Sequence, residues 1–117
     1  MIRFNQPGLV GPELEYLAEA VAAGHISSSG PFSERASAML CTSLGAPDVA
    51  LTTSCTDALE LTAMLLDLGP DDTVIVPSFT FTSTALAFAR QGARIRFADI
   101  EPVTLGIDPE HVEQLID

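Results

Sequence analysis

The sequence predicts an α/β fold in which parallel strands are joined by crossover helices. From residue 48 onward, short apolar runs of strand length alternate with longer segments whose apolar residues recur at helical spacing. The connections between them are short, which favours parallel strands with helices crossing over a sheet face. At 117 residues and 47% hydrophobic composition, the chain holds material for one domain or part of one.

The charge balance argues against two classes of partner. The chain carries 16 acidic and 5 basic side chains, a formal charge of -11, which repels nucleic-acid phosphates and anionic membranes. All the basic residues are arginines, and lysine is absent. A covalent link to a carbonyl cofactor needs a primary amine, which a guanidinium group cannot supply.

The chain shows no sequence signal for export or for metal binding. The first seven residues contain no apolar run of signal-peptide length, and no later stretch could span a membrane, so we expect a cytoplasmic protein. Cys41 and Cys55 lack metal-ligand spacing, so we expect reduced thiols and no metal site. His25 and His111 have no carboxylates at ligand spacing, and we expect both side chains to face solvent.

Residues 1–47 are expected to form an arm and two helices. Apolar residues at helical spacing predict a first helix from about Pro12 to Gly24, and a second from Phe32 that is ended by Gly45. The segment between them is polar and is interpreted as a loop.

Residues 48–117 are expected to form the α/β part, with a sheet of about three strands. The predicted strands cover 49–53, 73–76 and 94–98, and the predicted helices cover 58–68, 83–91 and a last segment from Asp108 through Leu115. So small a sheet would leave apolar edges exposed, and we expect the isolated chain to associate with other chains.

Hydroxyl side chains gather at both strand-to-helix junctions. The run from Thr52 to Leu59 places Ser and Thr at a helix N-terminus, where free N–H groups and the helix dipole suit an anion. Ser54-Cys55-Thr56-Asp57 also fits a capping box, and ordinary helix capping is the alternative. The glycine pattern of dinucleotide folds and the P-loop lysine are both missing here. At the second junction, Phe79 and Phe81 could cover a flat ring or pack in the core.

These segments, in this order, resemble the DegT/DnrJ/EryC1/StrS family of sugar aminotransferases. The resemblance spans the chain and rests on the joint order of its motifs, which are Asn5-Gln6-Pro7, Gly30-Pro31-Phe32, Thr53-Ser54-Cys55-Thr56-Asp57-Ala58-Leu59, Pro77-Ser78-Phe79-Thr80-Phe81-Thr82-Ser83-Thr84 and Phe97-Ala98-Asp99-Ile100.

The resemblance implies the N-terminal part of the large domain of a fold-type I transferase that depends on pyridoxal 5'-phosphate. Residues 48–117 would be a truncated cofactor-binding domain, and the family works as a homodimer. Ser54, Cys55, Thr56 and Asp57 match the segment that binds the cofactor phosphate, with the Thr56 and Asp57 N–H groups as donors. Phe81 matches the aromatic residue stacked on the pyridine ring, with Ser83 beside it. The residues implied near the sugar nucleotide are Asn5, Pro7, Gly30 and Phe32.

By resemblance, the reaction moves an amino group from glutamate to a 4-keto-6-deoxy sugar linked to a nucleotide. The family's lysine, and the acid that faces the pyridine nitrogen, lie beyond Asp117 by that resemblance, so we expect no catalytic residue here and a chain inactive alone. Two alternatives stay open. One is a dehydratase of the same family, and the other is a noncatalytic α/β binding module that pairs with another chain.

Overall fold

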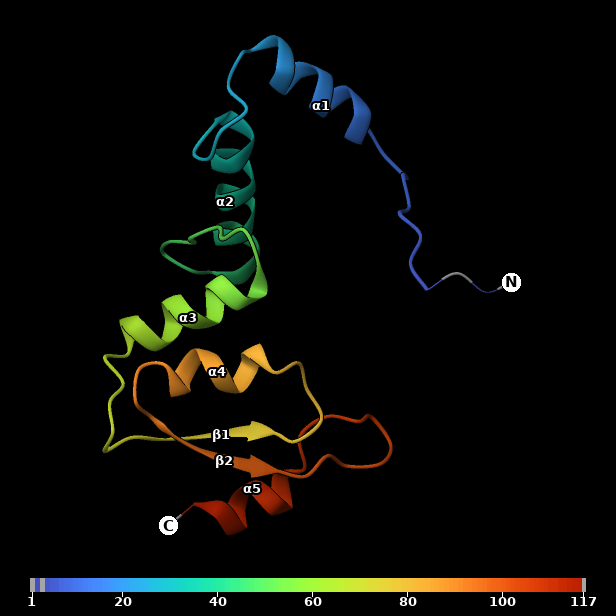
Figure 1. The fold of residues 1–117 in the computed structure, drawn as a ribbon. Helices are drawn as coiled ribbons and strands as arrows, with labels where there is room; N and C mark the ends of the chain where they lie inside the picture. Colours follow the sequence, from blue (N-terminus) through green and yellow to red (C-terminus); the bar gives the residue numbers. More distant parts are fainter. Residues whose placement is uncertain (1, 3, 117) are drawn as a thin grey trace. The chain divides into compact units, whose positions relative to one another are not determined.

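The structure divides into two compact units. It is a computed structural model that describes residue 2 and residues 4–116. One unit covers Met1–Leu51 and the other Thr52–Asp117, and each is described by itself. Figure 1 traces the helices and strands of both. Within the described residues, no helix is long and apolar enough to cross a membrane.

The first unit consists of an irregular arm and two helices. Helix α1 covers Glu13–Ala22 and helix α2 covers Pro31–Leu44. The carboxylate of Glu13 accepts hydrogen bonds from the N–H groups of Val10 and Gly11, so the end of the arm folds back on the first helical turn. Bonds from its own N–H and from those two groups lower the pKa of Glu13.

A cluster of two aromatic rings and one guanidinium group joins α1 to α2. The rings of Tyr16 and Phe32 lie 5.4 Å apart between centroids, and the guanidinium carbon of Arg35 lies 5.1 Å and 5.2 Å from them. Such contacts combine aromatic packing with attraction between the cation and the ring faces. The cluster therefore connects one side chain of α1 with two of α2.

The second unit contains a two-stranded parallel sheet, which confirms the predicted fold class. Helix α3 covers Cys55–Leu65, strand β1 Thr73–Pro77, helix α4 Ser83–Ala89, strand β2 Arg94–Ala98 and helix α5 Pro109–Leu115. Thr73 lies opposite Arg94, and Pro77 opposite Ala98. Figure 1 shows α4 and α5 on opposite faces of the sheet, with α3 packed against α4.

The predicted strand at residues 49–53 is wrong. A strand needs a neighbour for its backbone hydrogen bonds, and in the described part of the chain β1 and β2 pair only with each other. The N–H of Val49 instead bonds to the side chain of Asp48, and the hydroxyl of Thr52 bonds to the carbonyl of Ser54. An apolar run indicates that a segment could be a strand, but it does not supply the neighbouring strand.

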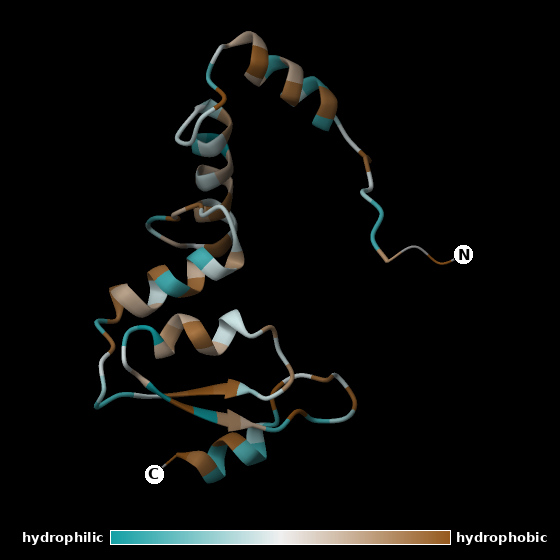
Figure 2. Ribbon diagram, viewed as in Figure 1, coloured by the Kyte–Doolittle hydropathy of each residue, from teal (hydrophilic) through white to brown (hydrophobic). Residues whose placement is uncertain are grey.

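The core of this unit is built from small side chains. Its buried apolar residues, among those described, are Ala63, Val76, Ala87, Ala93 and Ala98. Small residues let the helices approach the sheet closely but remove little apolar surface from water. The larger side chains of Met64, Leu65 and Leu66 at the end of α3 stay exposed. Figure 2 shows β1 as mostly hydrophobic, whereas β2 mixes hydrophobic and hydrophilic colours.

The close approach of α4 to its neighbours can be tested at one buried alanine. Ala87 is 1% exposed, so a leucine side chain at this position would collide with the atoms packed around it. We therefore expect Ala87→Leu to lower the free energy of unfolding by about 1–3 kcal/mol. Ala89→Leu adds the same side chain at an exposed position of the same helix and should change stability by less than about 0.5 kcal/mol. Urea denaturation of both variants measures the difference, and equal losses would contradict the close packing.

Candidate functional site

The functional groups of the second unit gather where the strands end. Strands β1 and β2 are parallel, so their carboxyl ends lie at the same edge of the sheet. Figure 1 shows the N-terminal ends of α3 and α4 on that same side, and α3 packs along α4. In α/β folds this edge is where ligands bind, because strand ends and helix N-termini both open there.

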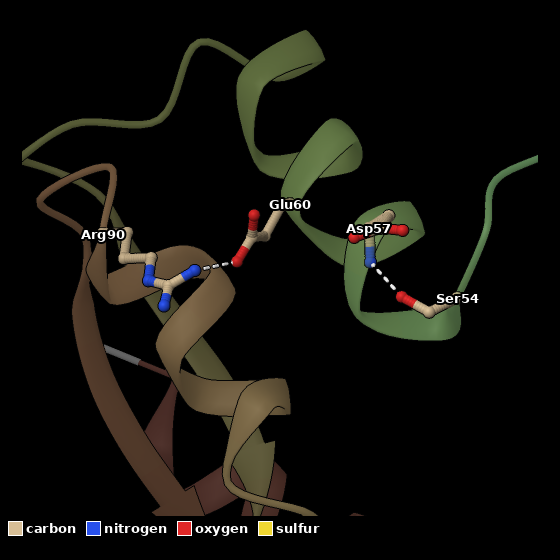
Figure 3. Close-up of polar contacts among 4 residues, drawn as sticks. All are labelled: Ser54, Asp57, Glu60 and Arg90. Atoms are coloured by element: carbon tan, nitrogen blue, oxygen red, sulfur yellow. Dashed lines mark hydrogen bonds and ion pairs between the residues drawn. The ribbon is translucent and has the colours of Figure 1, made fainter.

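The hydroxyl turn before α3 is organised around Ser54. Its backbone is extended, with φ of -155° and ψ of 163°, and its Oγ accepts a hydrogen bond of 3.1 Å from the N–H of Asp57 (Figure 3). The hydroxyl of Thr53 donates to the Asp57 carboxylate, and that of Thr52 donates to the Ser54 carbonyl at 2.8 Å. The predicted helix cap at Ser54 is confirmed, and its residues hold one another in place.

Two backbone donors of the first turn of α3 remain free. The Asp57 N–H is used by the cap, and the Ala58 N–H bonds to the Ser54 carbonyl at 3.1 Å. In the described part of the chain, the N–H groups of Cys55 and Thr56 have no acceptor. The Thr56 N–H, one of the two donors that the family resemblance implies, is therefore available, and so is the Cys55 N–H. The other implied donor, the Asp57 N–H, is already bonded to Ser54.

The electrostatics of the turn combine a positive helix end with one fixed carboxylate. The Thr53 hydroxyl, followed by the Ser54 hydroxyl, holds the pKa of the Asp57 carboxyl below its ordinary value of 3.8. Asp57 is therefore ionised at neutral pH and favourable to the helix dipole. An incoming anion would meet the N–H donors of Cys55 and Thr56, and the Asp57 carboxylate nearby is held by its hydroxyl partners.

The aromatic residues after β1 lie on the surface, so the alternative that they pack in the core is wrong. Phe79 and Phe81 are 70% and 79% exposed, because the chain leaves the sheet after Pro77. A hydrogen bond of 3.0 Å between the hydroxyls of Thr80 and Thr84 spans this junction. Ser83 begins α4 and is half-buried. The structure leaves both rings available to a ligand or to further polypeptide.

The residues implied near the sugar nucleotide belong to the first unit and do not form one cluster. Gly30 is buried at the start of α2, where an alanine Cβ would lie 2.9 Å from Cδ2 of the His25 ring. Gly30 and Phe32 line a groove of about 460 Å³, together with Leu17, Val21, His25 and Arg35. Asn5 and Pro7 lie in the exposed arm and do not line this groove.

Sequence reasoning missed two contacts of the second unit. His111, expected in solvent, is half-buried and accepts a hydrogen bond of 2.9 Å from the Asp99 N–H. Arg90 forms an ion pair with Glu60, which connects α4 to α3 (Figure 3). The partners lie 12 and 30 positions apart, so helical periodicity could not reveal either pair. Only the packing of the elements brings them together.

The lowered pKa of Asp57 predicts a specific acid response. Its folded pKa lies below the unfolded value, so its stabilising effect is complete above about pH 3.8 and is lost as pH falls through the folded value. We therefore expect Asp57→Asn to destabilise the chain at pH 7, with a smaller difference from the original chain at pH 2–3. Urea denaturation at both pH values measures it. A difference that stays constant, or that survives unchanged in a Thr53→Val background, would contradict the role of the Thr53 hydroxyl.

Comparison with known proteins identifies the family. The model of the DegT/DnrJ/EryC1/StrS aminotransferase family matches residues 9–117. A curated relative, dTDP-4-dehydro-2,3,6-trideoxy-D-glucose 4-aminotransferase from Saccharopolyspora spinosa, is 39% identical over 99% of this chain and 30% of its own length. This chain thus spans about a third of that relative.

Solved structures give the same result. The aminotransferase TlmJ from Streptoalloteichus hindustanus is 36% identical and superposes with a TM-score of 0.87, covering 100% of this chain and 32% of TlmJ. The putative sugar aminotransferase Spr1654 from Streptococcus pneumoniae, solved in its PLP form, is 29% identical with a TM-score of 0.79 over 98% of this chain and 29% of its own. This chain belongs to the DegT/DnrJ/EryC1/StrS aminotransferase family.

Proposed function

We propose that this chain provides the start of the cofactor-binding domain of a sugar aminotransferase that depends on pyridoxal 5'-phosphate. In this proposal residues 48–117 carry the cofactor side of the site, and residues 1–47 carry the arm and helices near the sugar nucleotide. The proposal rests mainly on the hydroxyl turn before α3, in a chain that belongs to the aminotransferase family. This turn has two unpaired N–H groups and lies at the carboxyl edge of a parallel sheet.

The described residues fit the phosphate of this cofactor. Phosphate binds well at a helix N-terminus, where backbone N–H groups and the helix dipole act together. Cys55 and Thr56 supply the donors, while the Ser54 Oγ keeps the turn closed by holding Asp57. The Thr53 hydroxyl donates to the Asp57 carboxylate and so fixes that side chain beside the turn. The phosphate would therefore meet a turn that is already shaped.

The exposed ring of Phe81 suits a flat aromatic ligand. It follows β1 at the carboxyl edge, and Ser83 begins the helix beside it. We assign Phe81 to cover one face of the pyridine ring and Ser83 to border it. When bound, the cofactor acts as the electron sink for amino transfer, and these side chains bind and orient it.

We infer a nucleotide-linked 4-keto-6-deoxy sugar as the amino acceptor and glutamate as the donor. The relative from Saccharopolyspora spinosa is a 4-aminotransferase of a dTDP-linked deoxysugar by its name. The Ser-Cys-Thr turn and the Pro-Ser-Phe-Thr-Phe run also resemble the transaminase that makes dTDP-4-amino-4,6-dideoxygalactose. In this proposal the loop at Gly30 and Phe32 and the arm at Asn5 and Pro7 contact the sugar nucleotide.

Covalent attachment of the cofactor requires a group that this chain does not supply. None of its 117 residues is a lysine, so no side chain offers the primary amine that covalent attachment of the cofactor requires. We propose that this amine comes from further polypeptide, that the complete enzyme is a homodimer, and that the 117 residues alone transfer no amino group.

Cys55→Pro tests the phosphate site with little effect on the helix. Proline is tolerated at the first helical position, and the extended backbone of Ser54 suits a residue that precedes proline. The substitution removes one free N–H donor. We expect the dissociation constant for pyridoxal 5'-phosphate, followed by its absorbance between about 330 and 430 nm, to rise roughly 10- to 100-fold, the loss of one hydrogen bond to a charged group.

Two controls separate phosphate recognition from other causes. Cys55→Ala removes the thiol but keeps the N–H, and it should bind like the original chain. Pyridoxal, which lacks the phosphate, should bind both chains equally weakly. Equal binding of pyridoxal and pyridoxal 5'-phosphate to the original chain would refute the phosphate site.

A further inference from the structure

The contact between His111 and Asp99 defines the protonation state of a histidine at the carboxyl edge. The Nδ1 atom of His111 accepts the backbone N–H of Asp99 at 2.9 Å. A ring nitrogen that accepts a hydrogen bond carries no proton, so His111 is neutral with its hydrogen on Nε2. Asp99 directly follows β2, and His111 lies in the first half of α5. The bond therefore ties the helix to the end of the strand.

Asp99 also closes the base of the loop that leaves β2. The carbonyl of Asp99 accepts a hydrogen bond of 2.8 Å from the N–H of Asp108, so the Asp99 residue is held through both of its backbone polar groups. Ile100 pairs with Ile107, and the Glu101 N–H bonds to the Gly106 carbonyl at 3.0 Å. Residues 99–108 thus form a loop with a closed base.

The charges around His111 give its protonated form a different partner. The Asp99 carboxylate, 76% exposed, has an oxygen 3.7 Å from the same Nδ1 atom. Helix α5 adds the acidic residues Glu110 and Glu113, and Asp108 caps it. Arg96 of β2 reaches the far end of α5 through the Leu115 carbonyl at 2.5 Å. A proton on Nδ1 would face the Asp99 carboxylate. The protonated Nδ1 atom could then no longer accept a hydrogen bond from the Asp99 N–H.

We propose that His111 is a positioning residue that clamps the base of the 99–108 loop when neutral and releases the Asp99 N–H when protonated. One proton from solvent adds to Nδ1, and the interaction changes from the Asp99 N–H to the Asp99 carboxylate. This role concerns the loop beside the proposed cofactor site and does not depend on cofactor binding.

The test combines the ring tautomer with exchange of one amide in the 117-residue chain. Nitrogen-15 NMR of the histidine rings at pH 8 should show His111 protonated only at Nε2. Between pH 8 and pH 5, the protection factor of the Asp99 amide against hydrogen exchange should fall roughly 2- to 10-fold, the net worth of one hydrogen bond. His111→Asn offers an amide oxygen in place of Nδ1 and cannot titrate, so its Asp99 protection should not change with pH.

His111→Ala removes the acceptor of the Asp99 N–H altogether. It should therefore abolish the hydrogen-exchange protection of the Asp99 amide at both pH values. The tautomer measurement and the asparagine variant decide the question if the alanine variant does not fold. A proton on Nδ1 at pH 8 would overturn the proposal. An Asp99 protection factor that changes equally in the original chain and in His111→Asn would also overturn it.

Discussion

The parallel pairing of β1 with β2 is the constraint on which the second unit depends. Two parallel strands that follow one another in the chain require a connection that returns to the starting edge, and α4 provides it. The same geometry places both strand ends at one edge, together with the N-terminal ends of α3 and α4. Phe81 lies near this edge because it follows the carboxyl end of β1, and the hydroxyl turn at Ser54 opens the N-terminus of α3, which packs against α4.

Small side chains set the packing around the sheet. Alanines at positions 63, 87, 93 and 98 bring the helices close, and the ion pair between Glu60 and Arg90 connects α3 with α4. A surface ion pair contributes little stability by itself, so the small side chains matter more for the spacing. The large apolar residues at the end of α3 and after β1 stay exposed. These surfaces are available for association with further polypeptide, which relatives three times as long contain.

Local signals in the sequence predicted the helix ends that are capped by a side chain or closed by a left-handed glycine. Gly45, with a φ of 64°, ends α2 as expected, and the side chains of Ser54 and Asp108 cap α3 and α5. Helix α3 begins at Cys55, directly after the Ser54 cap and ahead of the apolar stripe that starts at Ala58. Caps and left-handed glycines act within a few residues, so one sequence is enough to read them.

Features that depend on distant residues could not be predicted in this way. The run at 49–53 has strand composition, but it lacks a neighbouring strand among the described residues. The exposure of Phe79 and Phe81 depends on which elements cover the end of β1, and the bond between His111 and Asp99 depends on how α5 packs against β2. The residue types of the candidate site were readable from the sequence. Which N–H groups stay free became clear only from the folded turn.

The central claim is that the free N–H groups of Cys55 and Thr56 receive the cofactor phosphate. The most direct measurement is a titration of the nitrogen-15 labelled chain with pyridoxal 5'-phosphate, followed through its amide resonances and completed by borohydride reduction. The account predicts that the amides of Cys55 and Thr56 shift most and that no side chain is covalently labelled. Shifts centred on the groove at His25 and Arg35, or a stable adduct on any side chain, would contradict it.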